Sequence, residues 1–470
     1  MFFFDFHGRD TELEELNKLY DRSGFRFAVV YGRRRVGKST MINRFISEGN
    51  KPSIRFMGLD QNDKQNLEGF SEAVLAKYPA AKDYLTGFES WEKALDYIVA
   101  SAESEKLVLF IDEYPYLATA NRAVSSVLQK YADYKFRETN IMLILCGSSM
   151  SFMENHVLGG KSPLYGRRDM QFKVEPFNYY ESARFFDGWS NVDKALAYGI
   201  AGGVPLYLQQ LSNCGSIAKG VKDSFLRKTG ALYEEPRNLL LQELREPAVY
   251  NTIIKSIATG STKPNEIATK TGEDSNKVSK YLTTLISLHL VKKELPVISA
   301  QERNGIYRLS DNMFRFWYKF VIDNNMHIEG GQIDYIYDEK ILPNLNAYMG
   351  HIFEDICIQF MKRKIMDKEM PFIFDSIGRW WGNNPEQKKQ REIDIIASSG
   401  KSAIFGSCKW TNEKIDKQDY DDLIENTNMF KQFTKKYYYF FSRTGFTSEV
   451  IKLAQSNPNV RLITLDEIYA

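Results

Sequence analysis

The sequence predicts an α/β protein with a parallel sheet in its first part and a second α/β unit at its end. Three continuous apolar runs lie at residues 27–31, 107–111 and 141–146, separated by stretches long enough to form helices. Continuous rather than alternating apolarity is typical of strands covered on both faces, as in a parallel sheet surrounded by helices. The last third of the chain again alternates apolar runs with amphipathic segments, which predicts a separate sheet with its own helices.

Composition limits the function classes. With 470 residues the chain exceeds a single core, and length suggests about three domains. A net charge of +2 gives no overall attraction to nucleic acid or membranes. The four cysteines are scattered without a C-x-x-C pair, which favours reduced thiols over disulfides or a zinc site. No window of about 18 residues is apolar throughout, and the start lacks a secretory signal, so we expect a cytoplasmic protein without a membrane partner.

The most specific motif follows the first apolar run. Residues 32–39 read GRRRVGKS and fit G-x-x-x-x-G-K-[ST] between a predicted strand and a predicted helix. The end glycines let such a loop fold back so that its amide N–H groups and the helix N-terminus face a phosphate. Lys38 is predicted to reach the β and γ phosphates of a nucleotide, and the Ser39 hydroxyl to ligate Mg²⁺. A chance glycine loop is the alternative. The predicted nucleotide contacts in this loop are Gly32, Arg33, Arg34, Arg35, Val36, Gly37, Lys38, Ser39 and Thr40.

An acidic pair ends the second apolar run, which reads LVLFIDE. Asp112, at the predicted strand terminus, can hold Mg²⁺ directly or through water, and Glu113 can polarise the water that attacks the γ phosphate. We therefore predict a metal ligand at Asp112 and a catalytic base at Glu113. A helix cap with a solvated acid is the alternative.

Two arginines precede a predicted strand in the stretch LYGRRDMQF. The planar guanidinium of Arg167 or Arg168 can stabilise charge that develops on a transferred phosphoryl group, as an arginine finger does. A surface arginine pair is the alternative. Sequence alone does not decide whether such a finger acts within its own chain or on a neighbour.

Residues 178–245 then have a helical pattern, which predicts a lid over the nucleotide. The pattern breaks at GGVP, where Pro205 has a fixed φ and no N–H and so makes a rigid corner that can lie over an adenine base. A plain helix break is the alternative.

Residues 246–309 predict three helices followed by two wing strands, at 291–300 and 306–309, with a turn at Asn304 and Gly305. That order is typical of a winged helix. Lys277 and Lys280 on the third helix are candidate DNA contacts, and a purely structural winged helix is the alternative.

The order of these segments resembles that of archaeal-type P-loop ATPases of the AAA/STAND group, over nearly the whole chain. The motifs that carry the resemblance are the phosphate loop, LFIDE, CGSS, LYGRR, GGVPLYL and LSDNMFRFWYKF. The resemblance implies ATP or ADP with Mg²⁺ as cofactors, and Ser148 as a sensor of the γ phosphate, although ordinary loop serines are the alternative. The phrase F-x-G-R-x-x-E around Arg9 resembles the stretch leading into many AAA-type domains, and it adds Arg9 to the nucleotide contacts.

In that family the last domain is similar to restriction-endonuclease-like folds, where a helix glutamate, a strand aspartate and E-x-K gather a metal. Glu354, Asp394 and Lys409 match these positions, but the expected glutamate is Ser407. A neutral hydroxyl is a poor ligand for a hard cation, and Glu392, on the strand face of Asp394, is the nearby substitute. The resemblance thus implies a second or vestigial metal site.

The function expected from these features is a Mg²⁺-dependent ATPase that acts as a nucleotide-gated switch coupled to a noncatalytic C-terminal domain. An ATP-dependent DNA-cleaving nuclease or a DNA-binding regulator is the alternative. DNA, bound by the winged helix or the last domain, and an unidentified protein are the candidate partners. The expected domains are an ATPase core at 1–177, a helical lid at 178–245, a winged helix at 246–309 and the nuclease-like domain at 310–470.

Overall fold

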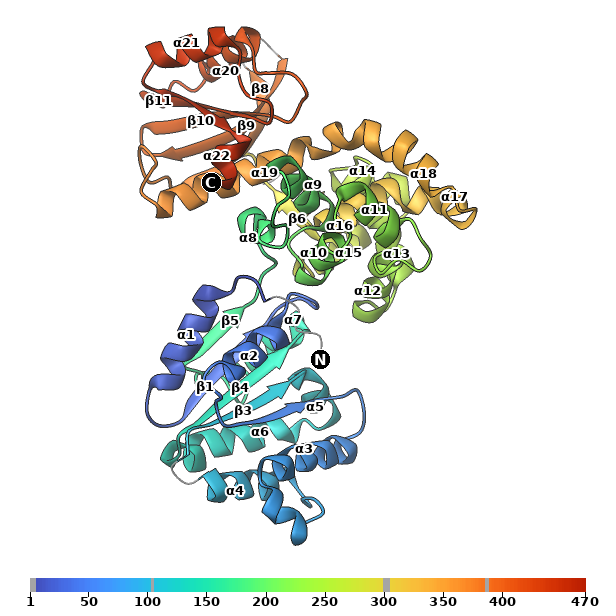
Figure 1. Cartoon of the computed structure of the whole chain (residues 1–470), viewed down its shortest axis with the longest axis vertical. Coiled ribbons are helices and arrows are strands. Elements are labelled where there is room, and N and C mark those ends of the chain that lie inside the picture. Colours follow the sequence, from blue (N-terminus) through green and yellow to red (C-terminus); the bar gives the residue numbers. More distant parts are fainter. Residues whose placement is uncertain (1–5, 103–104, 299–304, 385–388) are drawn as a thin grey trace. The chain divides into compact units, whose positions relative to one another are not determined.

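The computed structural model describes residues 6–102, 105–298, 305–384 and 389–470, and the chain divides into two compact units (Figure 1). The first unit consists of Met1–Pro176 and Val204–Leu206, and the second of Phe177–Gly203 and Tyr207–Ala470.

A parallel sheet of five strands forms the centre of the first unit, in the order β2-β3-β4-β1-β5. The strands are β1 (Arg26–Tyr31), β2 (Ser53–Met57), β3 (Leu107–Asp112), β4 (Ile141–Gly147) and β5 (Met170–Lys173). The three apolar runs therefore form β1, β3 and β4, which lie next to one another, as the α/β prediction required. Because parallel strands end at the same edge, the residues that follow β1, β3 and β4 come together there.

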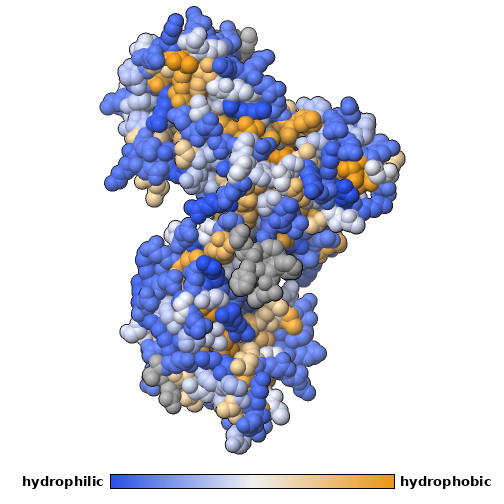
Figure 2. All heavy atoms as spheres, viewed as in Figure 1, coloured by the Kyte–Doolittle hydropathy of each residue, from blue (hydrophilic) through white to orange (hydrophobic). Residues whose placement is uncertain are grey.

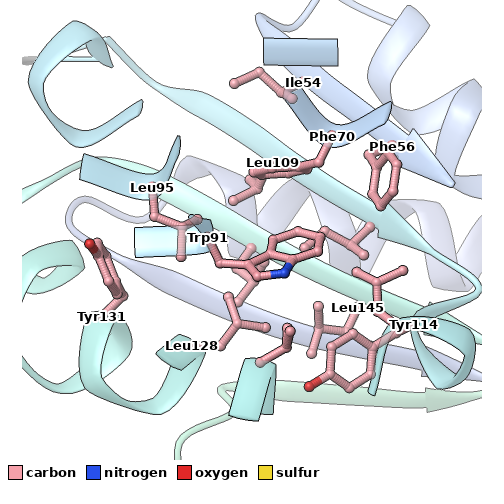
Figure 3. Close-up of a cluster of buried hydrophobic side chains, with 14 of the residues drawn as sticks. Ile54, Phe56, Phe70, Trp91, Leu95, Leu109, Tyr114, Leu128, Tyr131 and Leu145 are labelled. Atoms are coloured by element: carbon pink, nitrogen blue, oxygen red, sulfur yellow. The ribbon is translucent and has the colours of Figure 1, made fainter. Parts of the chain in front are cut away.

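Helices cover both faces of this sheet (Figure 1). The helices are α1 (Asp10–Asp21), α2 (Lys38–Ser47), α3 (Asp63–Lys77), α4 (Trp91–Ala102), α5 (Tyr114–Ala120), α6 (Ala123–Lys130) and α7 (Met150–Phe152), the last continued by a π-helical turn, η4 (Met153–Val157). Successive strand side chains point to opposite faces, so Val29 packs with α3 to α6 whereas Val30 packs with α1 and α2. Figure 3 shows the first of these cores around the indole of Trp91.

The second unit begins with helices. These are α8 (Tyr179–Ala183), α9 (Asn191–Ala201), α10 (Pro205–Ser212), whose first two residues belong to the first unit, α11 (Ile217–Phe225) and α12 (Glu235–Glu243). They are followed by α13 (Pro247–Ala258), α14 (Pro264–Thr271), α15 (Ser275–Ser287) and the antiparallel strands β6 (Val291–Glu294) and β7 (Ile306–Leu309). The strand expected at 291–300 is shorter than predicted, and Asn304 of the expected turn lies outside the described residues.

Helices α16 (Asn312–Phe320), α17 (Asn325–Glu329), α18 (Ile333–Tyr335) and α19 (Leu345–Met366) then lead to a second sheet. Its strands are β8 (Ser376–Asn384), β9 (Lys389–Ser399), β10 (Ser402–Lys409), β11 (Lys435–Ser442) and β12 (Val460–Thr464), in the order β12-β11-β10-β9-β8. Strands β10 to β12 are parallel, whereas β8 and β9 are antiparallel additions. The remaining helices are α20 (Lys417–Thr427), α21 (Ser448–Ser456) and α22 (Leu465–Tyr469).

The second sheet confirms the predicted C-terminal α/β unit. Residues 372–375 precede β8, and α22 follows β12 at the end of the sheet. Helix α22 is too short for its periodicity to be recognised, but Thr464 and Glu467 form a capping box at its start.

No helix among the described residues is long and apolar enough to cross a membrane. Figure 2 shows that each unit presents mostly hydrophilic side chains on the face in view, with small apolar patches between them.

Candidate functional site

The loop between β1 and α2 has the backbone that its glycines predict. Gly32 has φ 153° and Gly37 has φ 87°, conformations that L side chains rarely adopt. A Cβ atom on Gly32 would lie 2.4 Å from the carbonyl oxygen of Val174, at the end of the β5 segment. This close approach leaves no room for a side chain, so glycine at this position is a steric requirement of the fold.

Lys38, the first residue of α2, folds back over this loop. Its Nζ atom donates hydrogen bonds to the carbonyl oxygens of Gly32 at 2.9 Å and Arg33 at 3.0 Å, and only 5% of the residue is exposed. Burial lowers the pKa of Lys38, although the nearby Asp112 and Glu113 oppose that shift. The ammonium is thus held at the mouth of the loop, with the next two residues, half-buried Ser39 and exposed Thr40, in the first turn of α2.

Arg9 donates hydrogen bonds to the backbone of the loop and of the segment after β5. Its Nη2 atom donates to the carbonyl oxygen of Val36 at 3.1 Å and to that of Glu175 at 2.6 Å, and the residue is buried. Arg9 therefore contacts the backbone of the phosphate loop, where the sequence suggested a contact with the nucleotide.

The three consecutive arginines of the loop differ in their surroundings. Arg33 is buried, Arg34 donates to the Tyr116 hydroxyl at 3.0 Å, and Arg35 adopts a left-handed conformation with φ 69°. The contact of Arg34 ties the loop to α5, which begins beside the acidic pair. Sequence reasoning missed Tyr116, because nothing in the local pattern links it to a residue 82 positions earlier.

The acidic pair stands where β3 ends, beside the loop. Asp112 is 7% exposed, and its Oδ1 atom accepts a hydrogen bond of 2.9 Å from the backbone N–H of Glu113. Glu113 adopts a left-handed conformation with φ 47°, which costs a residue other than glycine about 1–3 kcal/mol. Strain of this size persists where the surrounding structure imposes it, and here it turns the carboxylate back toward β4.

Ser148 donates two hydrogen bonds to the carboxylate of Glu113. The Oε2 atom of Glu113 accepts a hydrogen bond from the Ser148 hydroxyl at 2.9 Å and another from its backbone N–H at 3.3 Å. Ser148 follows β4, so the strand order β3-β4-β1 brings the ends of three apolar runs into one place. The pairing of Glu113 with Ser148 is a direct result of that topology.

The two predicted finger arginines are not equivalent. Arg167 forms a bidentate ion pair with Asp133, at 2.7 and 2.8 Å, and also donates to the carbonyl oxygens of Pro163 and Tyr165. These bonds would have to break before Arg167 could contact a phosphate. Arg168 makes no hydrogen bond or ion pair with any described residue, and it lies close enough to Tyr31 to oppose the burial that raises the pKa of that phenol.

Pro205 lies against the loop. A Cβ atom on Gly37 would be 3.7 Å from the Pro205 Cγ atom, a van der Waals contact. The short segment Val204–Leu206 accordingly belongs to the first unit, although the chain on both sides of it belongs to the second.

The residues of the expected C-terminal metal site have other partners. Glu354, on α19, is paired through Oε2 with Nε of Arg379, a β8 residue that is only 1% exposed. Arg379 also binds Glu294 Oε1 at 2.7 Å and Asp355 Oδ1 at 3.0 Å. Burial raises the pKa of Glu354, but His351 and Arg379 lower it by more, so the net shift of the pKa is downward. A guanidinium therefore neutralises the carboxylate that was expected to hold a cation.

Asp394 and Lys409 are likewise engaged in bonds within the protein. Asp394 Oδ2 accepts from the backbone N–H of Cys408 at 2.7 Å, and Lys409 pairs with Asp419 at 2.9 Å. Burial raises the pKa of Asp394 to about 7, with a smaller contribution from Glu354. Glu392, two residues before Asp394 and so on the same face of β9, is exposed. Among the described residues, no group of three or more acidic, histidine or cysteine side chains could hold a metal ion.

The fold and the loop together define a P-loop ATPase domain, and comparisons with known proteins agree. Residues 3–211 match the family model of an ATPase domain found predominantly in Archaea, and residues 317–421 match a model of archaeal and bacterial proteins of unknown function, DUF234. The chain is 30% identical over 433 residues to the uncharacterized protein MJECL04 of Methanocaldococcus jannaschii, covering 90% of this chain and 92% of that protein. The chain belongs to the family of that archaeal protein, and in this chain the ATPase match precedes the DUF234 match.

Two solved structures are similar over most of their length. A Walker-type ATPase of Pyrococcus abyssi has 17% sequence identity and a TM-score of 0.49, over 67% of this chain and 96% of that chain. The ORC2 protein of Aeropyrum pernix has 14% identity and a TM-score of 0.44, over 69% of this chain and 94% of that chain.

Proposed function

We propose that this protein binds ATP with Mg²⁺ and hydrolyses it, and that the bound nucleotide acts as a switch on the second unit. The observation that carries the proposal is that Lys38, bonded to the carbonyl oxygens of the glycine loop, lies near Glu113, whose backbone is left-handed and whose carboxylate is held by Ser148. The buried ammonium of Lys38 and the left-handed backbone of Glu113 each cost folding free energy. Both are useful where a phosphate must be bound and attacked.

The chemistry assigns a role to each group. The loop amides and Lys38 would hold the β and γ phosphates, and Ser39 with Asp112 would supply oxygen ligands for Mg²⁺, which prefers such hard ligands. When bound, Mg²⁺ neutralises charge on the phosphates. Glu113 would take a proton from the attacking water, while Ser148 fixes the direction of its carboxylate.

Arg168 is the better candidate for an arginine finger. Its guanidinium has no partner among the described residues, whereas every contact that holds Arg167 would be lost if Arg167 moved. In the proposed cycle Arg167 braces the loop before β5, and Arg168 stabilises charge on the γ phosphate.

The switch would operate through the segment Val204–Leu206. A nucleotide can bias two arrangements of a protein only by its difference in affinity for them. Pro205 lies beside Gly37, so a nucleotide in the loop would lie near the segment Val204–Leu206, where the chain of the second unit is interrupted by residues of the first. We propose a closed monomer with ADP bound as the resting state.

In this proposal residues 178–245 act as a lid, residues 246–309 as a winged helix and residues 310–470 as a nuclease-like domain without catalytic activity. The helices α13 to α15 followed by β6 and β7 support the second assignment, and exposed Lys277 and Lys280 on α15 are its candidate DNA contacts. The pairing of Glu354 with Arg379 supports the absence of cleavage.

The experiment that tests nucleotide binding is titration of a fluorescent ATP analogue with the wild-type chain and Lys38→Ala. Loss of the buried ammonium should abolish measurable binding, because Lys38 is the group assigned to the β and γ phosphates. Lys64→Ala, at an exposed lysine of the same unit, is the matched control and should bind normally. Unchanged affinity of Lys38→Ala would refute the assignment of the loop.

A further inference from the structure

The ATPase core contains a cleft that is separate from the nucleotide-binding loop. A cleft of about 840 Å³ is bounded by α5 and α6 on one side and by α7, η4 and the loop at 159–163 on the other. Among the described residues that line it, none belongs to the phosphate loop or to the pair Glu113 and Ser148. The cleft is therefore a separate site, although α5 begins directly after Glu113 and α7 begins two residues after Ser148.

Its charge is positive. Arg122 and Lys161 line the cleft, and no acidic residue does so in the part of the chain that the structure describes. Arg122 and Lys161 are exposed and make no hydrogen bond or ion pair with any described residue. The acid on the same turn, Glu154, is paired instead with Lys173 at 3.5 Å. Two uncompensated cations at one cleft attract an anion.

An aromatic surface accompanies these cations. The rings of Phe152 and His156 lie 4.8 Å apart at an angle of 33°. Phe152 also packs against the buried core of the sheet, so its ring is fixed, while His156 is exposed on top of it. Thr119 and Ser162 add hydroxyl groups to the lining.

Cations beside an exposed aromatic ring suit single-stranded nucleic acid. Such proteins bind the backbone phosphates with Lys and Arg and stack the bases on aromatic side chains. A free phosphate, or a peptide of Asp and Glu alone, would use the cations but not the rings. The volume is at the upper end for small-molecule sites, which leaves room for a short segment of a strand.

We propose that this cleft binds single-stranded nucleic acid, with Arg122 and Lys161 on the phosphates and a base on the ring of His156. This site lies in the ATPase core and is independent of any DNA contact by the second unit. Its binding requires no nucleotide, so its failure would leave the proposed ATPase function intact.

The test is fluorescence anisotropy with a labelled 12-nucleotide single strand and the full chain without nucleotide. Arg122→Glu with Lys161→Glu should weaken binding at least tenfold, because it reverses both phosphate contacts. The matched control exchanges the same charges at Lys64 and Lys82, exposed lysines of the same unit, and should change affinity by less than about twofold. An unchanged melting temperature checks that both variants fold.

Two further measurements separate the role of the two cations from that of the His156 ring. Substituting Arg122 and Lys161 by alanine should lower the slope of log affinity against log salt by about 1.4, the value for two lost phosphates on a single strand. His156→Ala should weaken binding about tenfold without changing that slope, because a stacked base carries no counterion. Equal binding by the charge-reversal variant and the wild type, or equally strong competition by poly-glutamate, would overturn the proposal.

Discussion

The carboxylate of Glu113 is held by Ser148 through two hydrogen bonds, of 2.9 Å from the hydroxyl and 3.3 Å from the backbone N–H. The two residues are 35 positions apart in sequence and meet because β3 and β4 are adjacent. A general base needs its carboxylate aimed at the attacking water, so Ser148 is expected to act by positioning Glu113.

Ser148→Ala should therefore lower the rate of ATP hydrolysis about tenfold and leave ATP affinity unchanged. The loss is partial because the backbone N–H remains. Steady-state kinetics combined with equilibrium binding measure the two effects, and Ser148→Thr, which retains the hydroxyl, should restore most of the rate. A weakened ATP affinity with a normal rate would assign Ser148 to binding instead.

The buried cluster around Arg379 should dominate the stability of the second unit. Arg379→Met leaves Glu354, Asp355 and Glu294 without their shared cation, and breaking a buried ion pair costs about 3–5 kcal/mol. Urea unfolding monitored by tryptophan fluorescence measures the change. Lys255→Met, which removes an exposed pair with Asp323, should cost at most about 1 kcal/mol. Similar values for the two variants would show that the cluster is not energetically special.

The pH dependence of stability should reflect Asp394. Burial raises its pKa from 3.8 to about 7, so between those values the folded state keeps a proton that the unfolded state has lost. Stability from this group is complete below the lower pKa and is lost as the pH rises through the folded pKa. Asp394→Asn should therefore stabilise the protein most above about pH 7, with the difference vanishing near about pH 4. Urea unfolding at several pH values measures the difference in free energy of unfolding between Asp394→Asn and the wild type. A difference that grows toward low pH would contradict a raised pKa of Asp394.

The C-terminal sheet should not cleave DNA. With ATP and either Mg²⁺ or Mn²⁺, single-stranded and duplex DNA should stay intact. The reason is that Arg379 is paired with the carboxylate of Glu354, which was expected to bind a metal ion. Ser407→Glu alone should not restore activity, since it leaves Arg379 in place. Gel analysis detects cutting, and specific cleavage that disappears in Asp394→Asn would establish the nuclease alternative.

Sequence patterns predicted the parts of this fold that depend on local periodicity. The strands β1, β3 and β4, the glycine loop and the start of α2 at Lys38 are all encoded by contiguous residues. Strand β2 gave no comparable signal, because it is an edge strand whose exposed and buried residues alternate.

The pairings that connect distant segments could not be predicted in the same way. The matching positions of Glu354 and Asp394 suggested a metal site, yet Arg379 enters from another strand and neutralises Glu354. The left-handed conformation of Glu113 is also imposed by its surroundings, because nothing in the type of residue favours it. These features come from tertiary structure, and they determine which of the predicted site residues are available for chemistry.

The central claim, that Glu113 is the base of an ATPase, is tested most directly by single-turnover hydrolysis in Glu113→Gln. This variant retains Lys38, Asp112 and the loop, so it should bind ATP as tightly as the wild type. Hydrolysis should be at least about 100-fold slower, because the amide cannot accept the proton of the attacking water. Bound nucleotide extracted from the variant should then be ATP, whereas the wild type yields ADP. Hydrolysis by Glu113→Gln at the wild-type rate would contradict this account.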